Sequence, residues 1–166
     1  LLNQHGNPQV LKNEEVEEST LKKLKSLDDK ATIFEFYYYK MALAFIQNNY
    51  EAALDNGLKA ISYEEEPTPW QITYPNFAVI LILTITKNLS KEDATSSNKA
   101  KLNKLLKSKR KLLKRISKDA PQNYLNKYEL ANAAYHLLSK KYSKAHTSFI
   151  KSIQAASESG FVHEEA

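Results

Sequence analysis

The sequence predicts an all-α fold of about three antiparallel helical hairpins, preceded by one extra helix. Apolar residues recur at helical spacing along most of the 166 residues, and short polar turns separate the periodic segments. An aromatic-x-x-Ala step also begins two of the returning helices, at Tyr50/Ala53 and at Tyr142/Ala145. Because one hairpin cannot cover its own apolar stripe, these repeats predict hairpins that stack side by side in a right-handed solenoid.

The first part of the chain predicts a lead-in and one helix, followed by a hairpin. Residues 1–30 hold the lead-in and a helix from Glu14 to about Ser26, which is acidic at its start and basic at its end, as the helix dipole favours. The remainder, residues 31–166, forms an irregular repeat region. Its first hairpin is predicted over residues 31–63, with a tight polar turn at Asn48 and the following Asn.

The second hairpin is predicted over residues 76–118 and is the least regular. Its first segment, residues 77–88, is ambiguous, because its β-branched residues favour a strand while its place between helical hairpins favours a buried helix. We predict a helix, since a lone strand would have nothing to pair with. Ser97 stands where the other two hairpins have Tyr50 and Tyr142, so this copy of the repeat is degenerate.

The third hairpin, residues 120–159, has the clearest boundaries. Asp119 and Gln122 have the spacing of a capping box, Pro121 suits a first turn, and Gly160 suits a left-handed stop. Its returning helix carries an apolar stripe that we expect to face inward. The stripe consists of Tyr142, Ala145, Phe149, Ile153 and Ala156.

The composition excludes several kinds of chemistry. The chain has no cysteine, which rules out disulfides and thiol catalysis and favours a reducing, cytoplasmic location. Its three glycines, at positions 6, 57 and 160, are too far apart for a phosphate-binding loop. The four histidines lack metal-site spacing, and the alternative of a metal between His136 and His146 has no acidic residue to support it. We therefore expect no catalytic residue, no cofactor and no metal in this segment, which is not predicted to be an enzyme.

A membrane-spanning helix is not expected either. Residues 67–86 carry no charge, but Pro67, Pro69 and Pro75 interrupt them, and the continuous apolar run at residues 77–83 is far too short to span a bilayer. The chain begins without Met and ends on HEEA, apparently within a new helix. We expect it to be a fragment of a longer protein.

The clearest charge feature is a basic run over residues 99–118, with ten Lys or Arg and no Asp or Glu. A helix with this charge could bind acidic lipid, nucleic acid or an acidic protein surface. The patch that we predict on it consists of Lys104, Lys107, Lys111, Lys114 and Arg115. No aromatic residue interrupts the run, so base stacking has no support, and a merely solvated outer helix face is the simpler alternative.

A repeat of helical hairpins favours binding of a protein or peptide, or of neighbouring domains of the same chain, on a concave surface lined by the first helix of each hairpin. The candidate contacts, chosen from the pattern alone, are Tyr39, Lys40, Asn132 and His136. A ligand on this surface would change how the hairpins stack and so relay a signal. The alternative function is an anion-binding module that uses the basic helix at residues 99–118.

Three segments resemble a known family. They are GNPQVLKNEEVEESTLKKL at residues 6–24, FYYYKMALAFIQNNYEAALDNGLKAI at residues 36–61, and residues 120–166. The last segment is the most specific, because it carries a Pro-x-Asn-aromatic element, a Lys-Tyr pair and a closing Gly-Phe-x-x-Glu-Glu-Ala. The matching residues are Pro121, Asn123, Tyr124, Lys127, Tyr128, Gly160, Phe161, Glu164, Glu165 and Ala166. Asn126 stands where the family usually has a His.

These segments are similar to the tetratricopeptide-like helical region of large multidomain sensor kinases. In such proteins an AAA/STAND-type ATPase module precedes the helical repeats, GAF and histidine-kinase modules follow them, and a Ser/Thr kinase domain often comes first. None of the catalytic modules of the family lies within this chain. The resemblance implies a connecting and sensing region, which scaffolds or relays signals, and not the kinase or ATPase itself.

Overall fold

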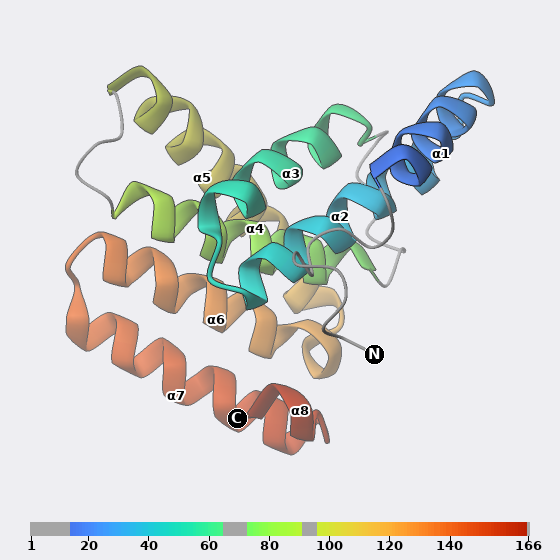
Figure 1. Cartoon of the computed structure of the whole chain (residues 1–166). Coiled ribbons are helices and arrows are strands. Elements are labelled where there is room, and N and C mark those ends of the chain that lie inside the picture. The colour runs from blue at the N-terminus through green and yellow to red at the C-terminus, as the bar shows by residue number, and fades with distance from the viewer. Residues whose placement is uncertain (1–13, 65–72, 91–95, 166) are drawn as a thin grey trace. The chain divides into compact units, whose positions relative to one another are not determined.

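The computed structural model describes residues 14–64, 73–90 and 96–165, and all of its regular structure is helical (Figure 1). The chain divides into two compact units, Leu1–Pro67 and Thr68–Ala166. The first unit contains α1 (Glu14–Ser26), α2 (Lys30–Ile46) and α3 (Tyr50–Ser62). The second contains α4 (Thr73–Leu89), α5 (Ser96–Asp119), α6 (Pro121–Leu138), α7 (Tyr142–Glu158) and the single turn α8 (Val162–Glu165). The predicted all-α class is therefore confirmed, with the helices packed in antiparallel pairs.

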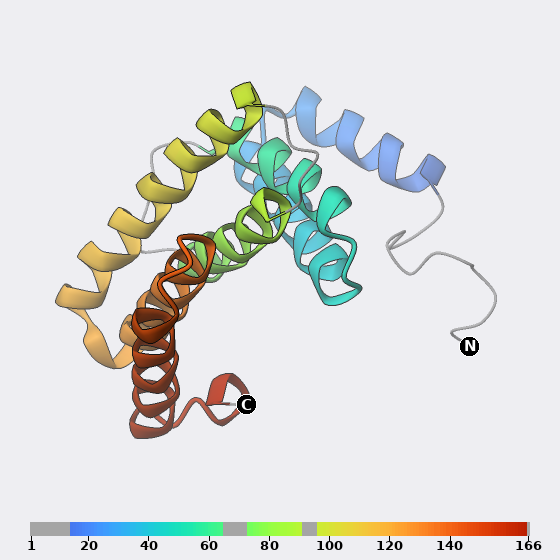
Figure 2. The ribbon, with the colours of Figure 1, turned by 90° about the vertical axis from the view of Figure 1, so that its left-hand side faces the viewer.

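The ambiguous segment at residues 77–88 is helical, as predicted, and lies within α4. Helix α4 packs against both α5 and α6, and its side chains are buried around most of its circumference. Phe77, Leu81, Ile82 and Ile85 are fully buried. A helix that is apolar on all sides must lie inside a domain or a membrane. The burial of these side chains and the packing against α5 and α6 make α4 the core helix of its unit (Figure 2). Within the described ranges no helix is long and apolar enough to cross a membrane.

Four of the turns between helices share one geometry. The left-handed residue is Asp28, Asn48, Lys140 or Gly160, with φ between 51° and 73°. In each turn the next N–H donates to the carbonyl oxygen five residues earlier, at 2.8 to 3.1 Å. This is the Schellman arrangement, and the Gly160 stop predicted from the sequence is confirmed. The same turn therefore joins α1 to α2, α2 to α3, α6 to α7 and α7 to α8.

The start of α6 corrects one prediction. Asp119 does not cap α6, because it is the last residue of α5, and Ala120 occupies the cap position without a side-chain hydrogen bond. The helix α5 extends this far because the Ala120 N–H still donates to the Ile116 carbonyl oxygen at 3.0 Å. Pro121 lies in the first turn of α6, as predicted, where its missing N–H leaves no bond unmade.

The inward face of α7 was predicted correctly only in part, since Ala145 and Ala156 of the predicted stripe are buried. Tyr142 and Ile153 are 67% and 44% exposed, although they were expected to face the core. The buried residues of α7 are all small: Ala145, Ser148, Ser152, Ala155 and Ala156. Small side chains let two helix backbones approach closely, so α7 turns this face, and not its larger apolar residues, toward its neighbour. The Ser152 hydroxyl accordingly donates to the Asn126 carbonyl oxygen of α6 at 2.8 Å.

The residues that carry the family resemblance have a structural role in this chain. Lys127 of α6 is buried, and its ammonium nitrogen lies 2.7 and 2.9 Å from the two carboxylate oxygens of Glu164. The same nitrogen lies 4.8 Å from the centre of the Phe161 ring. Asn126 also donates to Glu164. These contacts attach α8 to the start of the α6–α7 pair, so Lys127, Phe161 and Glu164 close this hairpin.

Candidate functional site

One face of α6 is the best candidate for a binding surface. Leu125, Glu129, Asn132 and His136 follow each other at spacings of four, three and four residues, which places them on one side of the helix. We call these four residues the α6 face. Helices α4, α5 and α7 all pack against α6, whereas the Cα traces of α5 and α7 make no contact with each other. The α6 face lies between α5 and α7, because Arg110 of α5 reaches Asn132 and residues of α7 line the groove beside Leu125 and Glu129. The buried Ala134 marks the opposite side of the helix.

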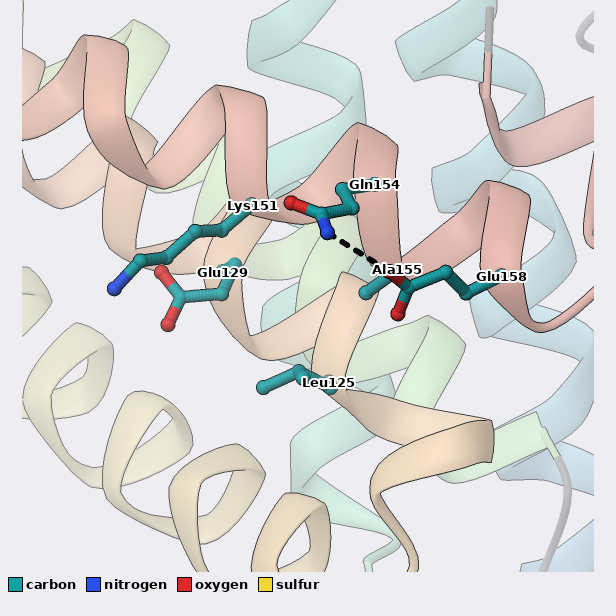
Figure 3. A pocket seen from close by; sticks show the side chains of 6 residues that line it. All are labelled: Leu125, Glu129, Lys151, Gln154, Ala155 and Glu158. Atoms are coloured by element: carbon teal, nitrogen blue, oxygen red, sulfur yellow. Dashed lines mark hydrogen bonds between the residues drawn. The ribbon is translucent and has the colours of Figure 1, made fainter.

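The first half of the α6 face opens into a groove of about 310 Å³ between α6 and α7 (Figure 3). Its lining residues are Leu125 and Glu129 from α6, and Lys151, Gln154, Ala155 and Glu158 from α7. The second carboxylate of the groove belongs to Glu158, which accepts a hydrogen bond from the Gln154 amide, one helical turn earlier on α7, at 2.8 Å. Figure 3 shows the side chains of Lys151 and Glu129 extending side by side from the two helices. This half offers an apolar floor, two carboxylates and one ammonium group to a ligand.

The second half of the α6 face is dominated by a cation from α5. Arg110 donates from Nη1 to the Asn132 Oδ1 atom at 3.0 Å, and its guanidinium carbon lies 4.0 Å from the centre of the Tyr135 ring. Asn132 is buried, so its amide is fixed in place. In the part of the chain that the structure describes, no carboxylate forms an ion pair with Arg110. The guanidinium is therefore held in position by an amide and an aromatic ring, without a counter-ion.

His136 lies at the same end and is surrounded by positive charge. Its carbonyl oxygen accepts from the Lys141 N–H at 2.8 Å, so the α6–α7 turn folds back beside it. Burial lowers the pKa of His136, and the charges of Arg110, Lys144 and Lys141 lower it further, while Glu129 opposes them. The ring is therefore neutral at pH 7. Its Nδ1 atom is buried and has no hydrogen-bond partner among the described residues.

The structure brings two of the four predicted contact residues together. Asn132 and His136 both lie on the α6 face, although Asn132 is buried behind Arg110. Tyr39 and Lys40 belong to α2 of the first unit. Tyr39 is 49% exposed and contacts the Tyr38 ring, and the Lys40 ammonium lies 5.5 Å from the centre of the Phe36 ring. Asn132 and His136 therefore belong to the second unit, and Tyr39 and Lys40 to the first.

Arg110, Glu129 and Lys151 were not predicted as site residues from the sequence. Arg110 and Arg115 are the two arginines of the chain, in a helix where every other cation is Lys. The use of Arg at these positions indicated a specific contact, because a planar guanidinium suits stacking and forked hydrogen bonds that an ammonium cannot make. Glu129 and Lys151 gave no signal, since single charged residues on helices are common and their meeting depends on how α6 and α7 pack.

The predicted basic patch is exposed. Lys104, Lys107, Lys111, Lys114 and Arg115 all lie at the surface of α5, together with Lys101 and Lys118. At 100° per residue these seven cations occupy about 140° of the helix circumference and extend along about 26 Å. None forms an ion pair within the described ranges. We call this set the α5 stripe.

The charge of the chain is divided between its two units. Thr68–Ala166 contains 17 Lys or Arg and seven Asp or Glu, a formal charge of +10. Leu1–Pro67 contains seven Lys or Arg and 12 Asp or Glu, a formal charge of −5.

Two cations of the basic run point away from the surface patch. Arg110 reaches α6, and the buried Lys109 donates to the Tyr74 hydroxyl of α4 at 2.6 Å.

Comparison with protein-family models, with curated proteins and with solved structures finds no match for this chain. The described residues also contain no group of three or more His, Asp or Glu that could hold a metal ion.

Proposed function

We propose that this chain is a non-catalytic, tetratricopeptide-like interaction module that binds an extended segment of another protein, or of a neighbouring domain, along the α6 face. The single observation that carries this proposal is the position of the α6 face between two helices whose backbones do not meet. A short segment laid along α6 would contact α5 on one side and α7 on the other, which is how a helical repeat uses its inner helices.

The groups on the α6 face suit recognition of a segment with a defined charge order. Glu129 and Glu158 favour a basic residue at the end near Leu125. Arg110 and the lysines of the α6–α7 turn favour an acidic group at the end near His136. Asn132 and Arg110 are held by each other, so little side-chain freedom is lost when a ligand binds.

Two further observations support a repeat module of the sensor-kinase type. The same Schellman turn recurs at four places, as expected if the helices derive from a repeated unit. The sequence resemblance implies that such a unit would lie between the catalytic modules of a larger cytoplasmic signalling protein. Binding at the α6 face would then change the packing of the hairpin and alter the attached modules.

The proposal is tested with peptides selected from a random display library on the purified full chain. We expect the selected peptides to bind the unmodified chain and to lose at least about tenfold in affinity on the Glu129→Lys and Glu158→Lys variants, because a repulsive pair replaces an attractive one. Glu51→Lys, at an exposed position of α3, is the matched control and should leave the affinity unchanged. Selected peptides that bind all variants equally would contradict the proposal.

The α5 stripe favours a second candidate function, an anion-binding surface. Seven cations on one helix face, none with an ion pair to another described residue, produce a field that attracts acidic lipid, nucleic acid or an acidic protein. The stripe contains no exposed aromatic or apolar residue, so such binding would be electrostatic and reversed by salt.

A further inference from the structure

The end of the α6 face near His136 collects cationic groups from the two helices on either side of α6. Arg110 comes from α5, His136 ends the row on α6, and Lys141 and Lys144 lie at the start of α7. We infer that this end binds the phosphoryl group of a phosphorylated side chain in the segment that occupies the α6 face. The inference rests on the proposed function, since it names the chemistry of one end of the bound segment.

Arg110 is prepared to bind an oxyanion before any ligand arrives. Its bond to Asn132 and its contact with the Tyr135 ring fix the plane of the guanidinium, and only one of its five N–H donors has a partner in the described part of the chain. An arginine that pairs with a protein carboxylate would be neutralised, whereas this one keeps its charge available. Forked N–H donors held in one plane match the spacing of two phosphoryl oxygens.

The start of α7 adds positive potential at the same place. In the equivalent turns the cap residues are Asp29 and Asn49, whose side chains accept from the N–H groups of Thr32 and Ala52. In α7 the cap residue is Lys141, which makes no such bond. A cation at a helix N-terminus is unfavourable beside the positive end of the helix dipole. This turn therefore lacks the side-chain acceptor oxygen that Asp29 and Asn49 provide at the other two helix starts. A bound dianion would supply it.

The charge at this end suits a phosphoryl group better than a carboxylate. A phosphorylated side chain carries a charge of about −1.5 to −2 at neutral pH and three acceptor oxygens. Arg110, Lys141 and Lys144 together carry three positive charges, and the neutral His136 can take up a proton once an anion lies beside it. Glu129 is the acidic residue that acts on this histidine, and its carboxylate belongs to the opposite half of the α6 face.

The test follows His136 in the full chain by NMR. Its ring signals are assigned with the His136→Gln variant and titrated with the blocked peptide acetyl-Ala-phosphoserine-Ala-amide. The same peptide with Ser or Glu in place of phosphoserine provides the comparison. We expect saturable shifts with the phosphopeptide, a rise in the pKa of His136 when it is bound, and at least about tenfold weaker binding of the Glu peptide.

Two arginine variants separate a site from a general field. Arg110→Gln should weaken phosphopeptide binding at least about tenfold, whereas Arg115→Gln removes the same charge from the exposed surface of α5 and should change it less than about twofold. Asn132→Asp should also weaken binding, because its new carboxylate occupies Arg110. Circular dichroism spectra that match the unmodified chain confirm that each variant is folded.

Three results would overturn the inference: no saturable shift with the phosphopeptide, equal losses in the two arginine variants, or equal affinity for the Glu peptide. These results leave the proposed function standing if library-selected peptides still depend on Glu129 and Glu158. If the selected peptides ignore those residues while the phosphopeptide binds through Arg110, the proposed function fails and the phosphoryl site remains.

Discussion

The carboxylate of Glu164 holds the ammonium group of Lys127 at 2.7 Å across the base of the α6–α7 pair. The two side chains are unequally buried, with 10% of Lys127 and 28% of Glu164 exposed. The cation also lies over the Phe161 ring. The contact therefore links a residue of α6 to the turn and helix that follow α7, and it stabilises the end of the second unit.

Removing one partner of this pair should be more harmful than removing the other. We expect Glu164→Gln to lower the free energy of unfolding by about 2 kcal/mol, because it leaves the more buried charge of Lys127 without its counter-ion. Lys127→Met should lower the free energy of unfolding by about 1 kcal/mol. The Met side chain keeps the packing of the Lys127 methylene groups, and the Glu164 carboxylate can turn toward water. Urea unfolding at neutral pH measures both. A larger loss in Lys127→Met than in Glu164→Gln would contradict this account of the pair.

A second buried cation should behave differently. Lys109 is 6% exposed, donates to the Tyr74 hydroxyl at 2.6 Å, and lies over the rings of Tyr74 and Phe77. Tyr74→Phe removes the hydroxyl acceptor and should lower the free energy of unfolding by about 1 to 3 kcal/mol. Lys109→Met should be neutral or stabilising, because it removes the cost of burying a charge while keeping a similar volume. Thermal and urea unfolding of the two variants test this, and a stability loss in Lys109→Met as large as that in Tyr74→Phe would show that the charge itself stabilises the core.

The environment of His136 predicts a pH dependence of stability. Its pKa in the folded chain lies below its ordinary value of 6.5, so the unfolded chain binds a proton first as the pH falls. The contribution of neutral His136 is therefore complete above about pH 6.5 and is lost as the pH falls through 6.5 toward the folded pKa. We expect the stability difference between the unmodified chain and His136→Gln to shrink or reverse between about pH 7.5 and pH 5. A difference that is constant over this range would contradict the lowered pKa.

The α5 stripe gives a prediction that does not depend on the α6 face. If this surface binds anions, retention on vesicles with acidic lipid or on duplex DNA should fall as salt rises. The combined change of Lys107, Lys111 and Lys114 to Glu should abolish the retention, because it replaces three attractive charges by repulsive ones. The control changes Lys22, Lys23 and Lys25 of α1 to Glu. These three lysines are also exposed, and the control variant should retain most of the binding. Equal effects of the two triple variants would show that net charge, and not the stripe, is responsible.

Sequence patterns predicted the helices better than their packing. Periodicity and turn chemistry located the hairpins, because Asn48, Pro121 and Gly160 act locally on the backbone. The helical state of residues 77–88 followed from their neighbours, since their β-branched content alone pointed to a strand. The apolar residues of α7 predicted its orientation only in part. Ala145 and Ala156 are buried as expected, but close contact with α6 also selects Ser148 and Ser152 over the larger apolar residues.

The candidate site was predictable only in part. Asn132 and His136 were selected from their place on the first helix of a hairpin, and both lie on the α6 face. Arg110 was hidden in a run of ten cations, although its planar group distinguishes it from the surrounding lysines. Its role depends on contacts between residues more than 20 positions apart in the chain, which no local pattern contains.

The most direct test of binding along the α6 face is a charge-swap cycle between Glu129 and the basic residue of a library-selected peptide. Affinities are measured for the unmodified chain and Glu129→Lys, each with the original peptide and with one whose basic residue is changed to Glu. We predict that the two changes compensate each other, with a coupling energy of about 1 kcal/mol or more. Changes that simply add, with no recovery in the doubly swapped pair, would contradict binding along this face.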